Sequence, residues 1–207
     1  PLATDGWLEI KVNGQTRRAG LTRIHMEEDA GKLVHGAGAF EDAQHSQVDL
    51  NRAGVPLIEL VGEPDLRTPE EAGAYLRTLR NTLLYLGVSH CDMEKGEMRC
   101  DANVSIRPKG QKELGTKVEL KNMNSFRFVE KGLAYEIERQ TRELEEGGTI
   151  IQETRLWNSE KHVTLAMRIK EFAHDYRYFP EPDLIPLQVT SSWIEEARKD
   201  LPEVGTK

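Results

Sequence analysis

Alternating apolar and polar residues predict strands in the first part of the chain. Residues 7–12 alternate, and Asn13 and Gly14 follow as a pair typical of a two-residue hairpin turn. The return strand is expected through residues 21–24, and residues 55–61 predict a short, largely buried strand with Pro56 at a sheet edge or strand start. Residues 31–47 have no periodicity and are expected to form a loop.

Helical spacing of apolar residues appears in two longer segments. The first helix is expected to begin after Thr68, which is followed by proline and two glutamates, and to end at Gly87. The second is expected over residues 124–147, and a short third helix opens at Ser192. The expected core positions are Ala72, Tyr75, Leu76, Leu79, Leu83 and Leu86 on the first helix and Phe126, Val129, Leu133 and Leu144 on the second.

Three more extended segments are expected at residues 150–157, 163–170 and 176–179. Strands and helices mix without a regular β-α-β order, and no internal repeat or low-complexity linker separates them. The pattern therefore predicts an α+β fold with a mixed, mainly antiparallel sheet and flanking helices.

Composition narrows the class of protein. The chain has 207 residues, 38% hydrophobic and 30% charged, which is typical of a globular protein, and no apolar run approaches the roughly 20 residues of a membrane span. A net charge of -7 argues against coating nucleic acid by bulk electrostatics, but it is compatible with a local basic groove or an acidic metal pocket. Cys91 and Cys100 are too few to crosslink this fold, which favours a reducing compartment.

Residues 98–107 carry the most informative polar pattern. If they form a strand, Cys100 and its alternate neighbours are buried, while Asp101 lies on the opposite face. Residues 116–121 repeat the pattern. The outward residues would be Arg99, Asp101, Asn103, Ser105 and Arg107 on the first strand and Lys117, Glu119 and Lys121 on the second. Alternating carboxylates and cations suit a magnesium–phosphate site, but also a solvated sheet with cross-strand ion pairs.

Other candidates each have a functional and a structural interpretation. Glu28 lies in an acidic run that could bind metal or form a charged loop, and Glu59 interrupts an apolar strand, either in a cavity or at a solvent-facing edge. Residues 121–126 could form an anion site at a helix start, or simply cap that helix. Residues 175–183 could grip substrate or form a rigid connection, and Cys100 is expected in the core.

Six segments together resemble one family. Residues 21–32, 48–59, 98–105, 119–126, 152–155 and 175–183 are similar, in the same order, to signatures of the B subunit of the bacterial and organellar aspartyl/glutamyl-tRNA amidotransferase. The resemblance implies a cradle-like α+β domain similar to the ATP site of glutamine synthetase. It also implies a bacterial cytoplasm or an organelle matrix.

The resemblance implies a two-step reaction that uses ATP and Mg²⁺. The side-chain carboxylate of Glu or Asp, mischarged on tRNA-Gln or tRNA-Asn, is phosphorylated, and ammonia then displaces the phosphate. The expected partners are an amidase A subunit, which releases ammonia from glutamine, and a small C subunit.

The resemblance also implies roles for individual residues. The implied catalytic and metal-binding residues are Glu28, Glu59, Asp101 and Glu119, with Glu28 as the foremost metal ligand. Arg99, Lys121 and Arg155 would neutralise phosphates, Asn122 would orient substrate or nucleotide, and Arg177 and Asp183 are weaker candidates.

The chain departs from the family pattern in three places, one of which is that the helical and tail domains expected after the catalytic domain are absent. The Gly-Leu-Glu-x-His segment with which family members begin is absent, and residues 40–47 look longer than usual. We therefore expect residues 1–190 to form a partial catalytic domain, inactive alone, and residues 191–207 to begin a helical region. The competing hypotheses are a non-catalytic RNA- or partner-binding module and a glutamine-synthetase-like ligase that acts on a free small acid.

Overall fold

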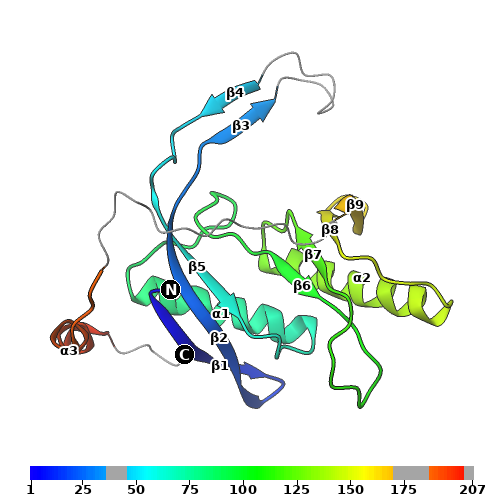
Figure 1. Cartoon of the computed structure of the whole chain (residues 1–207), viewed down its shortest axis with the longest axis horizontal. Coiled ribbons are helices and arrows are strands. Elements are labelled where there is room, and N and C mark those ends of the chain that lie inside the picture. Colours follow the sequence, from blue (N-terminus) through cyan, green and yellow to red (C-terminus); the bar gives the residue numbers. More distant parts are fainter. Residues whose placement is uncertain (36–45, 170–186, 203–207) are drawn as a thin grey trace. The chain divides into compact units, whose positions relative to one another are not determined.

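The computed structural model describes residues 1–35, 46–169 and 187–202 (Figure 1). Contacts divide the chain into two compact units, Pro1–Leu66 and Arg67–Lys207, which we describe separately. The predicted boundary at residue 190 is a different division, and it stays a prediction. None of the described helices is long and apolar enough to cross a membrane.

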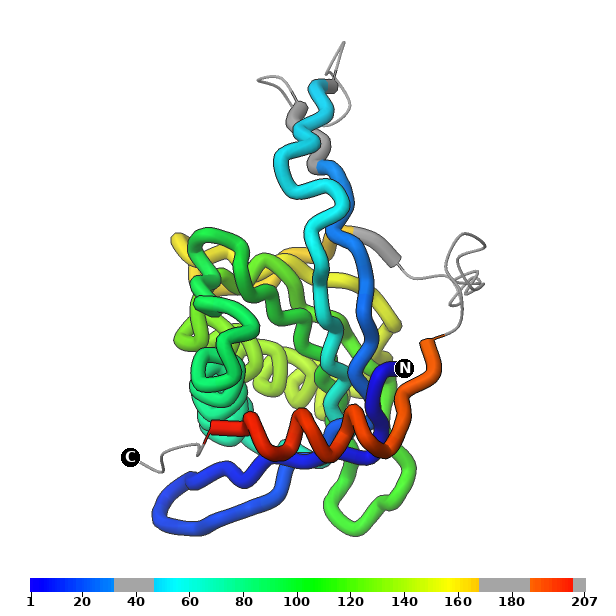
Figure 2. The backbone as a smooth tube through the Cα atoms, turned by 90° about the vertical axis from the view of Figure 1, so that its left-hand side faces the viewer, coloured from blue at the N-terminus to red at the C-terminus, as the bar shows by residue number. Residues whose placement is uncertain are grey.

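The first unit contains a three-stranded antiparallel sheet in the order β1-β2-β5. Strands β1 (Ala3–Val12) and β2 (Gln15–Glu28) form the blue hairpin of Figure 2, and β5 (Pro56–Gly62) pairs with β2. The turn has Asn13 at φ 51° and Gly14 at φ 77°, the left-handed conformations that a tight hairpin turn requires. The predicted hairpin is confirmed, as is the strand that Pro56 begins, but the predicted burial of that strand is wrong, because β5 is an edge strand and its residues are half-buried or exposed.

Strands β3 (Lys32–His35) and β4 (Ser46–Asp49) form an antiparallel pair, so the loop predicted over residues 31–47 is wrong at both ends. Residues 36–45, between the strands, lie outside the described residues. The pairing follows from the backbone: Asp29 N donates to Val55 O at 2.9 Å, and Gly54 N donates to Asp29 O at 2.9 Å. These bonds extend the β2–β5 ladder toward β3 and β4, and backbone pairing of this kind requires no apolar alternation.

The second unit begins with helix α1 (Pro69–Tyr85). The Thr68 side chain accepts a hydrogen bond from Glu71 N at 3.2 Å, which confirms the predicted cap. The predicted core positions of α1 are buried at Ala72, Leu76, Leu79 and Leu83, whereas Tyr75 is only half-buried. Leu86 is 40% exposed instead, because it follows the last helical turn and the chain then reverses at Gly87 (φ 66°).

Helix α2 (Phe126–Glu145) begins after Ser125, whose hydroxyl accepts from Phe128 N at 3.2 Å. Val129 and Leu133 are buried as predicted, but Leu144 is 42% exposed. This 20-residue helix is about 30 Å long, so its last turn extends beyond the short strands that it covers. Helix α3 (Ser191–Asp200) is capped by Thr190 rather than by Ser192, and none of its residues is buried.

Four strands complete the second unit in the order β6-β7-β8-β9. Their bounds are Ala102–Val104, Val118–Lys121, Glu153–Asn158 and Val163–Ile169. Only β7 and β8 are parallel, so the predicted α+β fold with a mainly antiparallel sheet is confirmed. The predicted strand at residues 98–107 is shorter than expected, and residues 176–179 lie outside the described residues. The likeness to glutamine synthetase stays a prediction.

Helix α2 covers one face of this sheet. Val118 and Leu120 of β7 and Trp157 of β8 are buried on that face, beside Val129 and Leu133 of α2. Trp157 lies 6.4 Å from Phe128 and 6.5 Å from Tyr135 between ring centroids. Because strand side chains alternate, the residues between these core positions point to the other, open face.

A carboxylate without solvent exposure lies between α2 and the sheet. Glu136 is 0% exposed and accepts hydrogen bonds from Arg139 Nε, Gln140 Nε2 and Thr164 Oγ1 at 3.0 to 3.1 Å. Arg155 Nε is 3.6 Å from its Oε2. The hydrogen bond to Glu136 raises the pKa of Arg139, and this effect outweighs the partial burial of the guanidinium, which lowers the pKa. The buried charge is therefore matched by two cations.

We predict that Glu136→Gln destabilises the protein by about 3 kcal/mol, because it removes the fully buried carboxylate from a group in which Glu153 also pairs with Arg139 and Arg155. The measurement is the free energy of unfolding from urea titration followed by circular dichroism. Glu138→Gln on the same helix is the matched control, since Glu138 is 76% exposed in its side chain and pairs only at the surface with Arg142. Equal stability of Glu136→Gln and wild type would contradict a structural role for this carboxylate.

Candidate active site

The register of the second sheet brings several predicted residues together on its open face. Asn103 lies opposite Glu119 across the β6–β7 pair, and Glu119 lies beside Thr154 across the β7–β8 pair. The next row contains Lys121, beside Leu156, and Leu156 pairs in turn with Leu165 of β9. Two rows of side chains therefore cross the sheet, one polar and one that passes from charged to apolar.

Lys121 connects the two predicted carboxylates. Its ammonium forms an ion pair with Asp101 and lies 3.6 Å from Glu119 Oε1. Burial alone disfavours the charged form, but the hydrogen bonds and charges of Asp101 and Glu119 outweigh it and raise the pKa of Lys121. The strand pairing that the sequence left conditional is confirmed, and it gathers a cation between two acids. The ion pairs are those of the structural alternative, a sheet with cross-strand ion pairs. The same three residues are also the ones proposed for the magnesium–phosphate site.

Glu119 is held from its other side by Thr154. The Thr154 hydroxyl, on a residue with 0% exposure, donates to Glu119 Oε2 at 2.8 Å. One carboxylate oxygen is therefore fixed by β8 and the other is directed toward Lys121. Thr154 was not among the predicted site residues, although its place in the 152–155 segment and the alternation along β8 could have indicated it.

The three other candidates of this unit lie apart from the cluster or make internal contacts. Arg155 is on the face covered by α2, where it donates to Thr164 Oγ1 at 2.8 Å and to Glu153 Oε1 at 2.6 Å. Asn122 follows β7 in a left-handed conformation (φ 63°), and its amide donates to Trp157 O at 3.1 Å. Arg99 is exposed, before the start of β6. Their proposed phosphate and substrate roles stay predictions.

In the first unit, Glu28 and Glu59 are not brought to one face. Glu28 lies opposite Pro56 and Glu59 lies opposite His25 in the β2–β5 register. Regular alternation assigns these two positions to opposite faces, and places Glu27 on the face of Glu59. Glu59 is exposed, so of its two predicted environments, a cavity or a solvent-facing sheet edge, the structure shows the sheet edge. Beside it, Arg23 Nε donates to His25 Nε2 at 2.6 Å, a contact that the sequence did not indicate.

Within the residues that the structure describes, no group of three or more His, Cys, Asp or Glu side chains is arranged to hold a metal ion. Asp101 and Glu119 are nevertheless two carboxylates joined to the same lysine. Magnesium often takes only one or two protein carboxylates and completes its shell with water and phosphate oxygens. Asp101 and Glu119 therefore fit such an ion, and Arg177 and Asp183 lie outside the described residues.

A pocket of about 720 Å³ lies where α2 begins. Its walls include Arg80 of α1, the loop around Asp92 and Lys95, and residues 124–126. The Ser125 hydroxyl is already used to cap the helix, so the capping interpretation of this junction is confirmed for Ser125. Acidic and basic side chains are mixed on the pocket walls, and this mixture does not favour one sign of ligand.

Comparison with known proteins identifies the family of the chain. The sequence model of the GatB/GatE catalytic domain matches residues 1–195. The chain therefore belongs to the GatB/GatE catalytic domain family.

Curated relatives are similar over almost the whole chain. The B subunit of the aspartyl/glutamyl-tRNA(Asn/Gln) amidotransferase of Carboxydothermus hydrogenoformans is 62% identical over 204 residues, which is 99% of this chain and 42% of that protein. The proteins of the same name from Persephonella marina and Herpetosiphon aurantiacus are each 58% identical, with 99% of this chain aligned to 42% and 41% of their lengths. The chain thus spans about two fifths of the length of these relatives.

We predict that the Cys100 thiol is unreactive in the folded protein. Burial, with the nearby negative charge of Asp101, raises its pKa to about 12, so almost no thiolate exists at pH 8. Iodoacetamide at pH 8 should leave Cys100 unmodified in the native protein and modify it in urea, as measured by mass spectrometry of the peptides. Cys100 is only half-buried, so its predicted place in the core is not confirmed, and rapid native alkylation would contradict the raised pKa of its thiol.

Proposed function

We propose that this chain supplies the ATP-dependent step of a tRNA-dependent amidotransferase. The observation that carries the proposal is the Asp101–Lys121–Glu119 cluster on the open face of the sheet, in a chain closely similar to the B subunits of aspartyl/glutamyl-tRNA(Asn/Gln) amidotransferases. The substrates are Glu-tRNA(Gln), Asp-tRNA(Asn) or both. The expected location is a bacterial cytoplasm or an organelle matrix.

The reaction takes two steps because a carboxylate is a poor acceptor for ammonia. An oxygen of the substrate side-chain carboxylate first attacks the terminal phosphorus of ATP, which gives an acyl phosphate and releases ADP. Ammonia then attacks the acyl carbon, phosphate leaves with the C–O bonding electrons, and loss of a proton gives the amide. The ammonia comes from glutamine hydrolysed by an amidase A subunit, and a small C subunit completes the proposed complex.

Charge determines the role of each residue. Triphosphate and the substrate carboxylate are both anions, so their approach requires neutralisation. Lys121 carries the positive charge of this cluster and can donate to a phosphate oxygen. Asp101 and Glu119 are the residues that would hold Mg²⁺, which supplies charge neutralisation for the phosphates when bound. Thr154 fixes the orientation of Glu119.

We predict that Asp101→Asn lowers ATP- and tRNA-dependent amidation by at least about 100-fold, the scale observed when an enzyme loses one preorganised group that stabilises charge in the transition state. Amide formation on mischarged tRNA is the measurement, in the assembled enzyme, with glutaminase activity as a test of integrity. Lys112→Met, in the exposed loop between β6 and β7, is the charge-removing control. Wild-type amidation by Asp101→Asn would remove the cluster from the site. Amidation of free glutamate without tRNA would instead favour the small-acid ligase.

Glu28 is tested separately, because the cluster does not include it. We predict that Glu28→Ala abolishes amidation and leaves the glutaminase of the assembled enzyme intact, whereas Glu27→Ala retains amidation. The two neighbours alternate between opposite faces of β2, so each controls for the general effect of losing an acid from this strand. Thermal unfolding with and without Mg²⁺ and ATP gives an independent readout, since a ligand that binds the native state raises the midpoint. Full activity of Glu28→Ala would exclude a required role.

A further inference from the structure

The open face of the second sheet continues beyond its charged cluster into an apolar strip. Across the strands, Lys121 lies beside Leu156, and Leu156 lies opposite Leu165. All three point to the face that α2 leaves open, since their neighbours Leu120 and Trp157 are buried on the other face. Leu165 is 46% exposed in this position.

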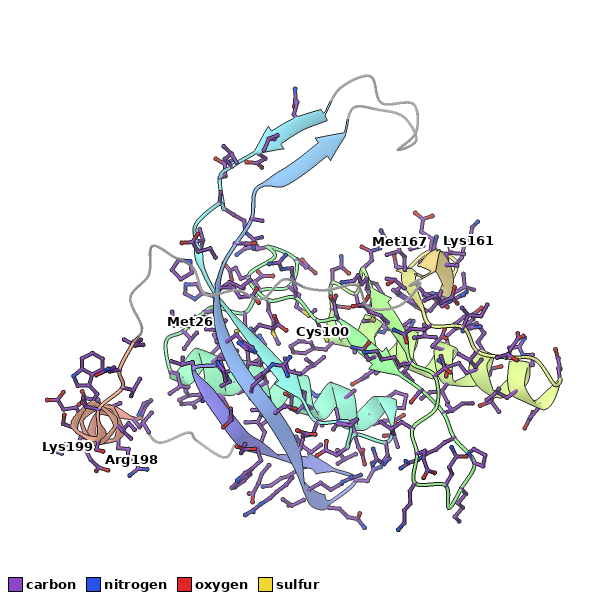
Figure 3. The ribbon with its side chains drawn as sticks, viewed as in Figure 1. Met26, Cys100, Lys161, Met167, Arg198 and Lys199 are labelled. Atoms are coloured by element: carbon purple, nitrogen blue, oxygen red, sulfur yellow. The ribbon has the colours of Figure 1, made fainter. Side chains whose placement is uncertain are left out.

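Exposed leucine on an edge strand is unusual enough to need a reason, because edge strands are commonly protected by charged residues. Two residues further along β9, Met167, labelled in Figure 3, is 55% exposed. Ala166, between Leu165 and Met167, pairs with Arg155 and therefore lies on the face that α2 covers. The row therefore has the ion pair of Lys121 and Asp101 at one end and an apolar strip, Leu156 and Leu165, at the other.

Two strand spacings separate Lys121 from Leu165, roughly 10 Å across the sheet. A ligand that uses both ends of the row must be anionic at one end and flat and apolar at the other. The two carboxylates beside Lys121 would repel a free polyanion, so the anionic end must arrive with a divalent cation. A nucleoside triphosphate in its magnesium complex has all of these properties.

We propose that Leu156 and Leu165 form the surface on which the base of the nucleotide lies, while its phosphates lie toward Lys121. This inference deepens the proposed function and depends on it, because it assigns the base-binding part of the same ATP site. It predicts that the apolar strip contributes to the affinity for ATP, and contributes nothing to the affinity for a triphosphate that lacks a base.

The test compares two probes, ATP and inorganic tripolyphosphate, each with excess Mg²⁺, binding to the assembled enzyme in calorimetric titrations. Leu165→Asp should weaken ATP binding about tenfold, from lost apolar contact, and leave tripolyphosphate binding unchanged within about twofold. Lys121→Met should weaken both probes. Leu114→Asp is the matched control, because Leu114 is 55% exposed in the loop between β6 and β7, away from the row.

Each outcome decides the question. If Leu165→Asp changed the affinity for both probes equally, or did not change the affinity for ATP, the base-binding assignment would be overturned. The proposed function would still stand in that case, provided that the wild type bound ATP. Loss of subunit assembly in Leu165→Asp would also overturn it, and would identify the strip as a protein interface. If wild-type enzyme bound neither probe, the proposed function itself would fail. Leu165→Ala, which removes less apolar surface without adding charge, should give a smaller loss of ATP affinity in the same direction.

Discussion

The two-sidedness of the β6-β7-β8-β9 sheet is the constraint on which the candidate site depends. Helix α2 covers one face, where Val118 and Leu120 of β7 and Trp157 of β8 are buried. The residues that alternate with them lie on the other face, where Thr154 is also buried beside Glu119. Glu119 and Lys121, which both belong to β7, meet Asp101 of the segment before β6 for this reason. A shift of β7 by one residue would exchange Leu120 with Lys121 and remove the cluster.

The covered face is itself charged at one point. Glu136 has no solvent exposure, and its hydrogen bonds join α2 to β9 through Thr164, while Arg155 links it to β8. Such a group is costly unless each partner is in place, which favours one arrangement of helix and strands over alternatives of similar hydrophobic burial. The open face therefore gains its geometry from contacts on the face behind it. Thr154, which donates a hydrogen bond to Glu119, belongs to β8, the strand that Arg155 links to Glu136.

Local patterns were sufficient wherever neighbouring residues determine the structure. The hairpin at Asn13 and Gly14 and the cap at Thr68 follow from short-range hydrogen bonding and backbone preference, and both were predicted correctly. Leu86 and Leu144 were assigned to the core because helical spacing says which side a residue faces, but it does not say how far the covering surface extends. The β3–β4 pair escaped prediction because backbone pairing there does not require an alternation of apolar residues.

By itself, the sequence determined the α+β class, the main helices, the family resemblance and the alternation that places Glu119 and Lys121 on one side of a strand. Tertiary structure alone decided which strands are neighbours, and hence that Asp101 reaches Lys121, that Thr154 holds Glu119 and that Leu165 continues the same row. It also assigned Arg155 to the covered face, and Glu28 and Glu59 to opposite faces of their ladder. The physical reason is that alternation is a property of one chain segment, whereas register arises from pairing between segments far apart in sequence.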